Sequence, residues 1–377
     1  MNKIPKKIGT ISLNINTPDF NYGAILHSWA FQKFLIKERL CENTEIIDYI
    51  TPSLESYDRN RPIINALKNK KIKSFIKNII IYRAYKKRLK KFTEFTKNHM
   101  IISSKHYTQK ELENSDLDYD TVICESDVIW SPGFFGGNFD RTFFMDLESM
   151  KHMKKIAYAP SMANGDLNEN QKKEMKKLLE SVDFISCRET YEKEILEELT
   201  PKNVEHVLDP VMLLEEKDYS EIVAERIIKD KYILLYLPVD NNKKLRKAAI
   251  QYAKDNNLKI LEITTKCIHI LGGKTLVSAG VQEFLSAIKY AETIFTNSFH
   301  AICFSLIFNK QFYAFSRNYY GKVKNICDVV GVNDRFFEND NFKILEEIDY
   351  LSVNKNIENL KQKSITWIKD AICKEGV

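Results

Sequence analysis

Apolar and polar positions follow two periods along the 377-residue chain, one typical of buried strands and one typical of helices. In the first half, short apolar runs predict strands at Lys7–Leu13, Ile46–Tyr49, Thr121–Cys124, Lys155–Ala159 and Asp183–Cys187. After Pro201 the pattern restarts and predicts strands at Val204–Leu208, Ile233–Leu237, Lys259–Ile263, Thr293–Thr296 and Gln311–Phe315. Segments with helical spacing separate most of these runs, which is typical of mostly parallel sheets with helices on both faces.

The restart divides the chain into two predicted domains. The predicted fold class is α/β, with two Rossmann-like domains facing a cleft, and the length of the chain fits two such cores. Residues 1–203 form the N-terminal domain and residues 204–377 the C-terminal domain. Ligands of such sheets bind beyond the carboxyl ends of the strands, so the loops that follow strands are the candidate sites.

The net charge of +6 hides a strongly basic segment. Residues 59–97 contain 14 Lys and Arg and a single acid, Glu94, so the segment is +13 and the rest of the chain is −7. We interpret the segment as one or two helices inserted in the N-terminal domain, with the charges on a solvated face. Because apolar residues interleave the basic ones, the alternative is peripheral contact with an anionic membrane face. No nucleic-acid-binding module accompanies the run, so we expect no nucleic-acid partner.

Several classes of protein have no support in the sequence. The seven cysteines are scattered without a C-x-x-C pair, and the histidines lack paired ligand spacing, so neither a disulfide framework nor a metal site is expected. No P-loop, dinucleotide fingerprint or G-x-S-x-G motif appears, and no bound cofactor is expected. The chain has no bilayer-length apolar run and no signal-peptide core near its N-terminus, which predicts a cytoplasmic location.

The strongest local signal lies between Thr293 and Ala301, where an apolar strand leads directly into a helix. Asn297 and Ser298 stand at the cap of that helix, whose N–H groups and partial positive charge suit a phosphate or carboxylate. His300 lies in the first turn, where it could transfer protons. The alternative is an ordinary capped helix with a half-buried histidine.

Two further strand ends carry polar or aromatic residues. After the strand at Thr121–Cys124, Asp127 could accept hydrogen bonds from sugar hydroxyls and Trp130 could pack on a sugar ring; alternatively, Asp127 caps a turn and Trp130 belongs to the core. Arg188 and Arg317 each follow a strand, and a guanidinium suits phosphate or carboxylate. Either arginine could instead form a surface ion pair.

Taken together, these segments resemble the polysaccharide pyruvyl transferase family. The matching stretches occur in order at residues 21–30, 126–132, 156–161, 186–189, 207–211, 278–285, 296–300 and 308–312. Each is weak alone, but their order and co-occurrence over about residues 8–335 make the resemblance specific. It implies a two-domain glycosyltransferase-B-like (GT-B-like) fold.

The chain departs from the family pattern at several positions. The family commonly has Gly where Glu125 stands, Gln where His27 stands, and Gly where Ala301 stands. Relatives place an arginine near the position of Ser298, so the donor phosphate would depend more on other arginines and on backbone N–H groups.

The resemblance implies phosphoenolpyruvate as co-substrate and a sugar or lipid-linked oligosaccharide as acceptor, on the way to an exopolysaccharide or cell-envelope glycan. By this hypothesis His300 transfers protons. The donor would be held by Arg188, Asn297, Ser298 and Arg317. The acceptor would face Asn21, Tyr22, Asp127 and Trp130. Two alternatives remain open: a nucleotide-sugar-dependent GT-B glycosyltransferase, and a non-catalytic membrane-peripheral component of polysaccharide assembly.

Overall fold

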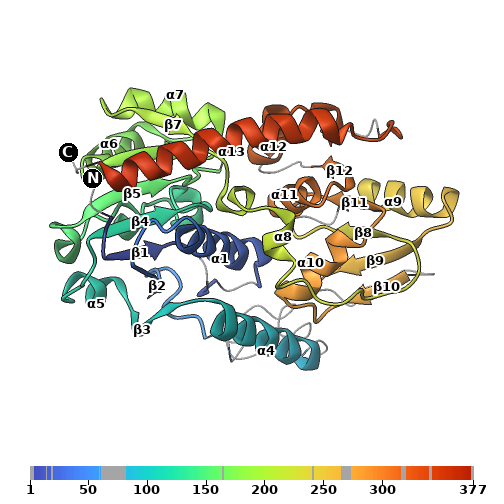
Figure 1. Ribbon diagram of the computed structural model, residues 1–377, viewed down its shortest axis with the longest axis horizontal. Coiled ribbons are helices and arrows are strands. Elements are labelled where there is room, and N and C mark those ends of the chain that lie inside the picture. Colours follow the sequence, from blue (N-terminus) through green and yellow to red (C-terminus); the bar gives the residue numbers. More distant parts are fainter. Residues whose placement is uncertain are drawn as a thin grey trace. The chain divides into compact units, whose positions relative to one another are not determined.

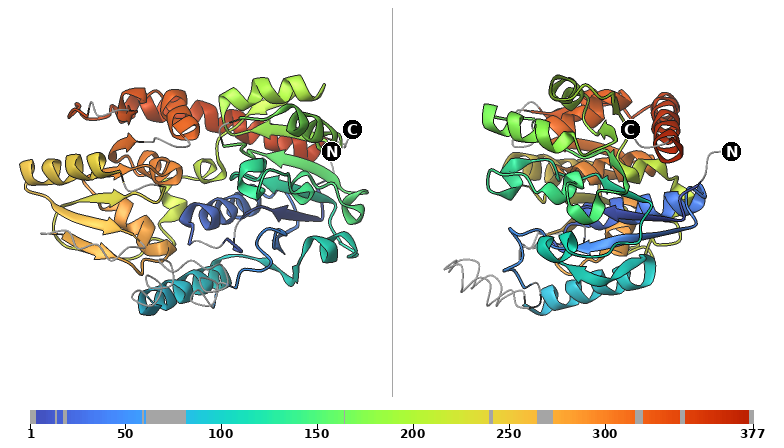
Figure 2. Two further views of the ribbon diagram at one scale, coloured as in Figure 1. Left: turned by 180° about the vertical axis from the view of Figure 1, so that it is seen from behind. Right: turned by 90° about the vertical axis from the view of Figure 1, so that its left-hand side faces the viewer.

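The computed structural model describes residues 4–13, 15–17, 20–58, 60, 82–163, 165–239, 242–264, 273–315, 320–338 and 342–374. The chain forms two compact units, each with its own parallel sheet (Figures 1 and 2). Unit 1 comprises Met1–Ser56, His99–Leu214 and Ile357–Val377, and unit 2 comprises Tyr57–Asn98 and Glu215–Asn356. Among the described helices, none is both long enough and apolar enough to cross a membrane.

Unit 1 contains a seven-stranded sheet in the order β3-β2-β1-β4-β5-β6-β7. Its strands are β1 (Lys7–Ile11), β2 (Asn43–Tyr49), β3 (Ile102–Tyr107), β4 (Thr121–Glu125), β5 (Lys154–Tyr158), β6 (Phe184–Cys187) and β7 (Val204–His206). Its helices are α1 (Tyr22–Lys37), α5 (Gln109–Glu113), α6 (Glu169–Leu179), α7 (Thr190–Leu199) and most of α13 (Tyr350–Cys373). Four 3₁₀ turns complete it: η1 (Pro132–Phe135), η2 (Arg141–Phe144), η3 (Glu148–Met150) and η4 (Pro210–Leu213).

Unit 2 contains a six-stranded sheet in the order β10-β9-β8-β11-β12-β13. Its strands are β8 (Tyr232–Tyr236), β9 (Lys259–Ile263), β10 (Gly273–Leu276), β11 (Thr293–Thr296), β12 (Gln311–Phe315) and β13 (Phe336–Phe337). Its helices are α4 (Tyr82–His99, except its last residue), α8 (Glu216–Tyr219), α9 (Lys243–Asp255), α10 (Val281–Lys289), α11 (Phe299–Ile307) and α12 (Tyr320–Val330), followed by the turn η5 (Asn333–Arg335).

The side-chain pattern explains why these elements form layers. All five residues of β8 and of β4 are buried, as expected where helices cover both faces of a parallel sheet. Helix α1 is buried on most sides, which matches its apolar residues all around the helix axis. Helix α9 instead buries one stripe, Leu245, Ala249 and Ala253, spaced four residues apart.

The boundary between the units lies later than the predicted one after residue 203. Strand β7 pairs in parallel with β6, for example Ile185 with Val204, so this strand completes the first sheet. The chain also returns to unit 1 at its end: the Leu208 backbone N–H donates to Ser364 Oγ on α13 (2.9 Å). Pairing and packing that join residues far apart in sequence override the restart that the sequence pattern indicated.

The basic segment was predicted to belong to the N-terminal domain, but its described part belongs to unit 2. Lys91 of α4 forms an ion pair with Glu283 of α10, and Arg88 Nη2 donates to the Thr264 carbonyl (3.3 Å). Phe92 and Phe95 are buried on the same helix. Residues 59 and 61–81 of the predicted insertion lie outside the described residues.

Candidate functional site

Both sheets have the strand order 3-2-1-4-5-6 over their first six positions, and this order creates one reversal point in each. In unit 1 the reversal lies between β1 and β4, and in unit 2 between β8 and β11. At such a point the chains leaving two neighbouring strands turn to opposite faces, which opens a crevice at the carboxyl ends. The residues after β4 and after β11 are therefore the positions to inspect, and both were singled out in the sequence.

In unit 1, side chains from four elements meet at the carboxyl ends of the strands. We call them the carboxyl-edge cluster: His27 and Ser28 from α1, Glu125, Ser126 and Asp127 at the end of β4, Arg188 after β6, and Asp209 after β7. All seven are buried, and none is more than 7% exposed. Buried charges require partners, so the arrangement of ion pairs defines this cluster.

Arg188 binds carboxylates on two sides. Its Nε donates to Glu189 Oε1 (2.7 Å) and its Nη1 to Asp209 Oδ2 (3.1 Å). Ser126 Oγ donates to the same Asp209 oxygen (2.7 Å). Burial alone would lower the pKa of Arg188, but Glu189 and Asp209 raise it above its ordinary value, so the guanidinium stays charged. Arg188 thus links the ends of β4, β6 and β7 in unit 1.

His27 and Glu125 form a second ion pair. His27 Nδ1 lies 2.6 Å from Glu125 Oε2, and Ser28 Oγ donates to Glu125 Oε1 (2.5 Å). His27 Nε2 lies 3.8 Å from Asp127 Oδ2. Burial acts to lower the pKa of His27, yet the two carboxylates outweigh it and raise that pKa to about 10. The imidazole is therefore a cation at neutral pH. The two departures from the family pattern, His27 and Glu125, are in direct contact.

Asp127 is held by an unusual backbone. Ser126 and Asp127 have φ angles of +50° and +57°, which place both residues in the left-handed region. Asp127 Oδ1 accepts from the Val128 N–H (2.8 Å). Left-handed non-glycine residues cost roughly 1–3 kcal/mol where they occur, and they concentrate at functional sites. The conformation fixes the direction of the Asp127 side chain.

A pair of buried glutamates borders this cluster. Glu192 Oε1 accepts from the Met162 N–H (2.7 Å). Burial, together with the charge of Glu189, raises the pKa of Glu192 well above its ordinary value. Glu192 therefore keeps its proton in the folded protein.

In unit 2, the turn after β11 spans the reversal point of the second sheet. Thr296 Oγ1 donates to the Tyr236 carbonyl at the end of β8 (2.7 Å), and Asn297 Oδ1 accepts from the Val239 N–H (3.4 Å). Ser298 is the N-cap of α11 and accepts from the Ala301 N–H (3.3 Å). His300, in the first turn, is 9% exposed and its ring packs edge-on against Phe299. The first turn of α11 carries no acidic residue.

Three of the predicted acceptor residues lie outside the carboxyl-edge cluster. Trp130 is fully buried, donates from Nε1 to the Phe143 carbonyl (3.0 Å) and stacks on Phe144, so it is core and cannot receive a sugar ring. Tyr22 is buried in α1. Asn21 is exposed and caps that helix, accepting from the Gly23 and Ala24 N–H groups. Asp127 alone of the four joins the carboxyl-edge cluster.

The predicted donor residues are also divided by the structure. Asn297 and Ser298 lie together with His300 at the N-terminus of α11. The sequence predicted that the Arg188 guanidinium would be available to a phosphate or carboxylate. In the structure Arg188 lies in unit 1, is buried and is paired with two carboxylates, so it does not present its guanidinium to solvent. Arg317 lies outside the described residues.

Sequence reasoning missed most partners in the carboxyl-edge cluster. Ser28 and Asp209 lie within the matching stretches and Glu125 was named as a departure from the family pattern, but none of the three was given a role. A signal was available for Asp209, which precedes Pro210 at a strand end, and for Glu125, which replaces a family glycine. Their contacts join residues about 20 to 100 positions apart, which local patterns do not encode.

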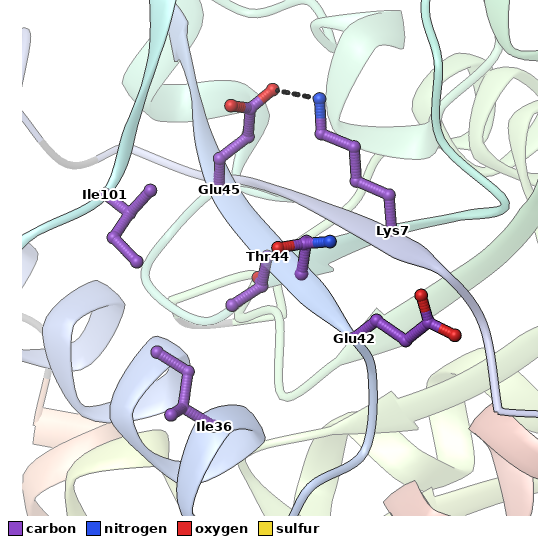
Figure 3. Close-up of a pocket in the computed structure, with 7 residues that line it drawn as sticks. Lys7, Ile36, Glu42, Thr44, Glu45 and Ile101 are labelled. Atoms are coloured by element: carbon purple, nitrogen blue, oxygen red, sulfur yellow. Dashed lines mark ion pairs between the residues drawn. The ribbon is translucent and has the colours of Figure 1, made fainter.

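A shallow hollow of about 550 Å³ lies at the opposite edge of the unit 1 sheet (Figure 3). Lys7, Asn43 and Thr44 at the start of β1 and β2 line it, and Lys7 pairs with Glu45 (2.9 Å). Ligands of parallel α/β sheets bind at the carboxyl ends, so this hollow at the amino ends is not the candidate site.

Three solved structures are similar to the chain over most of its length. UDP-GlcNAc 2-epimerase from Methanocaldococcus jannaschii is similar over 93% of this chain and 91% of its own, with 14% identity and a TM-score of 0.51. UDP-GlcNAc 2-epimerase from Neisseria meningitidis matches over 98% and 94%, with 8% identity and a TM-score of 0.46. E. coli ADP-heptose lipopolysaccharide heptosyltransferase II matches over 95% and 99%, with 10% identity and a TM-score of 0.39.

The similarity to the Methanocaldococcus jannaschii structure, together with the two parallel sheets, supports a two-domain GT-B-like fold, the predicted class. No curated protein sequence matches the chain. The family model described as polysaccharide pyruvyl transferase matches residues 21–319, which include the turns after β4 and after β11. The match spans more than half of the chain and confirms the resemblance seen in its motifs: the chain belongs to the polysaccharide pyruvyl transferase family, a family of transferases.

Proposed function

We propose that this protein transfers a pyruvyl group from phosphoenolpyruvate to two hydroxyls of a sugar, with His300 as the proton-transferring residue. The family match is the observation that carries the proposal, because it covers the turn where Asn297, Ser298 and His300 meet. The products are a cyclic pyruvyl ketal and inorganic phosphate.

The donor belongs at the N-terminus of α11. Phosphoenolpyruvate carries about three negative charges near neutral pH, one on its carboxylate and about two on its phosphate. A helix start that spans a reversal point and has no acid in its first turn suits such a ligand. Asn297 and Ser298 are already ordered there by backbone hydrogen bonds. In this scheme Arg188 stabilises unit 1 and does not hold the donor.

The reaction needs one proton delivered and two removed. His300 gives a proton to C3 of phosphoenolpyruvate, and the π electrons of the C2–C3 double bond form the new C–H bond. The first sugar hydroxyl bonds to the cationic C2 and loses its proton to a base. The second hydroxyl then bonds to C2 and gives its proton to the phosphate, which leaves with the C–O bonding electrons. Histidine is the side chain that most often transfers protons in such steps.

Phosphate release tests the proposal. Wild type and His300→Gln are incubated with phosphoenolpyruvate and a panel of sugar and lipid-linked acceptors, and inorganic phosphate is measured. We expect acceptor-dependent release by wild type and a loss of about 10²- to 10⁴-fold in the variant. His152→Gln is the matched control, since His152 is exposed in unit 1 and its loss should leave turnover unchanged.

Two results would direct the proposal elsewhere. The GT-B-like fold also serves nucleotide-sugar chemistry, so stabilisation by UDP or GDP without any effect of phosphoenolpyruvate would favour a glycosyltransferase. Absence of turnover with either donor class would favour a non-catalytic component of polysaccharide assembly.

The exposed face of α4 supports a peripheral membrane contact, which we propose as part of this function. Its exposed side chains include five cations and one acid: Arg83, Lys86, Lys87, Lys90, Lys97 and Glu94. Phe92 and Phe95 of this helix are buried, and Lys91 pairs with Glu283 of α10. Basic residues near an anionic bilayer contribute about 1 kcal/mol each, and an acceptor carried on a lipid would lie at that surface.

Vesicle sedimentation tests this contact. Vesicles of phosphatidylcholine with and without phosphatidylglycerol are compared at low and high salt, using wild type and a Lys86→Glu/Lys87→Glu variant. We expect binding only to the anionic vesicles, lost in the variant and at high salt. Lys176→Glu/Lys177→Glu on α6 is the matched control, because those lysines are equally exposed but lie in unit 1. Equal loss in both variants would show that net charge alone drives binding.

A further inference from the structure

The reaction scheme leaves one base unnamed and leaves the most deeply buried ion pair of unit 1 without a role. His27 and Glu125 are both 0% exposed, and they meet at the reversal point between β1 and β4. Glu125 Oε2 contacts His27 Nδ1 (2.6 Å), while Glu125 Oε1 accepts from Ser28 Oγ (2.5 Å). Both carboxylate oxygens of Glu125 are thus occupied by α1, and the glutamate cannot turn toward a ligand.

The other nitrogen of the imidazole is directed at Asp127. His27 Nε2 lies 3.8 Å from Asp127 Oδ2, a distance at which opposite charges attract strongly in a buried site. A ring that is protonated on both nitrogens can serve both carboxylates at once. The raised pKa of His27, about 10, agrees with this geometry, since it reflects the charge of Glu125 and of Asp127 acting against burial.

Asp127 differs from Glu125 in what its carboxylate can reach. It is the cluster's most exposed carboxylate, at 7%, and it sits on the turn that follows β4. Its left-handed backbone and the bond from the Val128 N–H fix Oδ1 and leave Oδ2 on the side of His27. Arg188, Asp209, the Tyr158 hydroxyl and the Cys124 thiol also act on these carboxylates.

We propose that His27 is a positioning residue: clamped by Glu125, its imidazolium keeps the Asp127 carboxylate ionised and oriented to accept the proton of the acceptor hydroxyl. The inference rests on the proposed function. The acceptor hydroxyl gives its proton to Asp127 Oδ2, and the O–H bonding electrons stay on the hydroxyl oxygen, which becomes the nucleophile.

The first experiment observes His27 directly and does not depend on turnover. Histidine labelled with ¹³C is followed by NMR between pH 5 and 10 in wild type and Glu125→Gln. We expect the His27 ring to stay protonated up to about pH 9 in wild type and to lose its proton at lower pH in the variant. A wild-type His27 that titrates near pH 6.5 would overturn the inference, whatever the activity.

The second experiment measures the pH dependence of turnover in His27→Gln. Loss of the neighbouring cation should raise the pKa of Asp127, so the acid limb of the kcat profile should move up by about one pH unit. We expect kcat to fall about 10- to 100-fold through misplacement of the base, with phosphoenolpyruvate affinity unchanged. Gln32→Leu is the matched control: Gln32 is buried on α1 but bonds only the Ile101 backbone, so its loss should not move the acid limb.

The outcomes separate the two proposals. A folded His27→Gln protein with unchanged kcat and acid limb would overturn the positioning role while the pyruvyl transfer stands. A wild type that releases no phosphate from phosphoenolpyruvate, yet keeps His27 charged, would overturn the proposed function and the acceptor role of Asp127 with it. Arg188, Asp209 and Tyr158 are unchanged in every variant, so their charges cannot account for a difference.

Discussion

Replacing Arg188 by methionine distinguishes a structural guanidinium from a donor-binding one. Methionine keeps much of the length and apolar stem of arginine but removes its charge. In the structure this leaves Asp209 and Glu189 buried without the cation that now bonds both of them. We therefore expect Arg188→Met to act on the stability of unit 1 rather than on the binding of phosphoenolpyruvate.

The size of the effect follows from the two lost ion pairs. Removing one partner of a buried ion pair costs about 3–5 kcal/mol, because the remaining charge is left without compensation. For a domain of 150–250 residues, each kcal/mol lowers the melting temperature by about 2–4 °C. The expected fall is therefore about 6–20 °C. Adding Asp209→Asn to Arg188→Met should recover part of the loss, since it removes one of the unpaired carboxylates.

Tryptophan fluorescence during urea unfolding is the assay of choice. The chain has three tryptophans, Trp29, Trp130 and Trp367, and all belong to unit 1, so the signal reports on that unit alone. This avoids treating a two-unit protein as a single two-state system. An unchanged urea midpoint, together with loss of the stabilisation that phosphoenolpyruvate confers, would refute the reasoning and return Arg188 to the donor site.

Three more substitutions follow from the geometry. Burial and Glu189 raise the pKa of Glu192, so the folded protein holds a proton that the unfolded chain releases above about pH 4.3, and the free energy of unfolding falls as pH rises. Glu192→Gln keeps the hydrogen bonds but does not titrate. It should be the more stable protein at pH 8, and its urea midpoint should decline less from pH 5 to 8. Trp130→Ala should cost about 3–5 kcal/mol of unfolding free energy in unit 1 with no change in acceptor KM among molecules that remain folded; a raised KM at unchanged stability would restore its sugar-binding role. Ser298→Ala should cost about 1 kcal/mol through the lost cap of α11 and weaken phosphoenolpyruvate binding by calorimetry, whereas unchanged binding would place the donor elsewhere.

The sheets could be predicted from the sequence wherever burial leaves a clear pattern. The ten predicted strands are all present, because central strands of a parallel sheet are apolar on both faces. The three that were missed, β3, β10 and β13, lie at or beside the sheet edges. β3 reads Ile-Ser-Ser-Lys-His-Tyr and is mostly exposed, so its polar residues resemble a loop. The position of an edge strand is set by its pairing with a neighbour, here β2. The spacing of apolar residues within β3 does not show which strand it pairs with.

Only the part of the candidate site that depends on local sequence could be predicted, because the rest depends on contacts between residues far apart in the chain. Cap positions are local, so the turn at Asn297 and Ser298 could be predicted. Trp130 could not be assigned, because an aromatic after a strand is equally compatible with core and with a ligand face, and the contact with Phe144 decides it. The pairing of His27 with Glu125 depends on the fold, since it joins α1 to the end of β4.

The electrostatics of each reversal point, taken within its own unit, indicate which class of substrate that point would suit. The carboxyl-edge cluster and its neighbour Glu189 contain more carboxyl groups than cations: Glu125, Asp127, Asp209 and Glu189 against His27 and Arg188. Both cations are already paired, so a donor with about three negative charges would be repelled there. A neutral polyol suffers no such repulsion, and a carboxylate such as Asp127 is a natural acceptor for its hydroxyl protons. At the N-terminus of α11 the balance is reversed, because the helix start is partly positive and its first turn has no acid. Donor affinity should therefore respond to changes around Ser298 and not to His27→Gln, while acceptor turnover should respond to both.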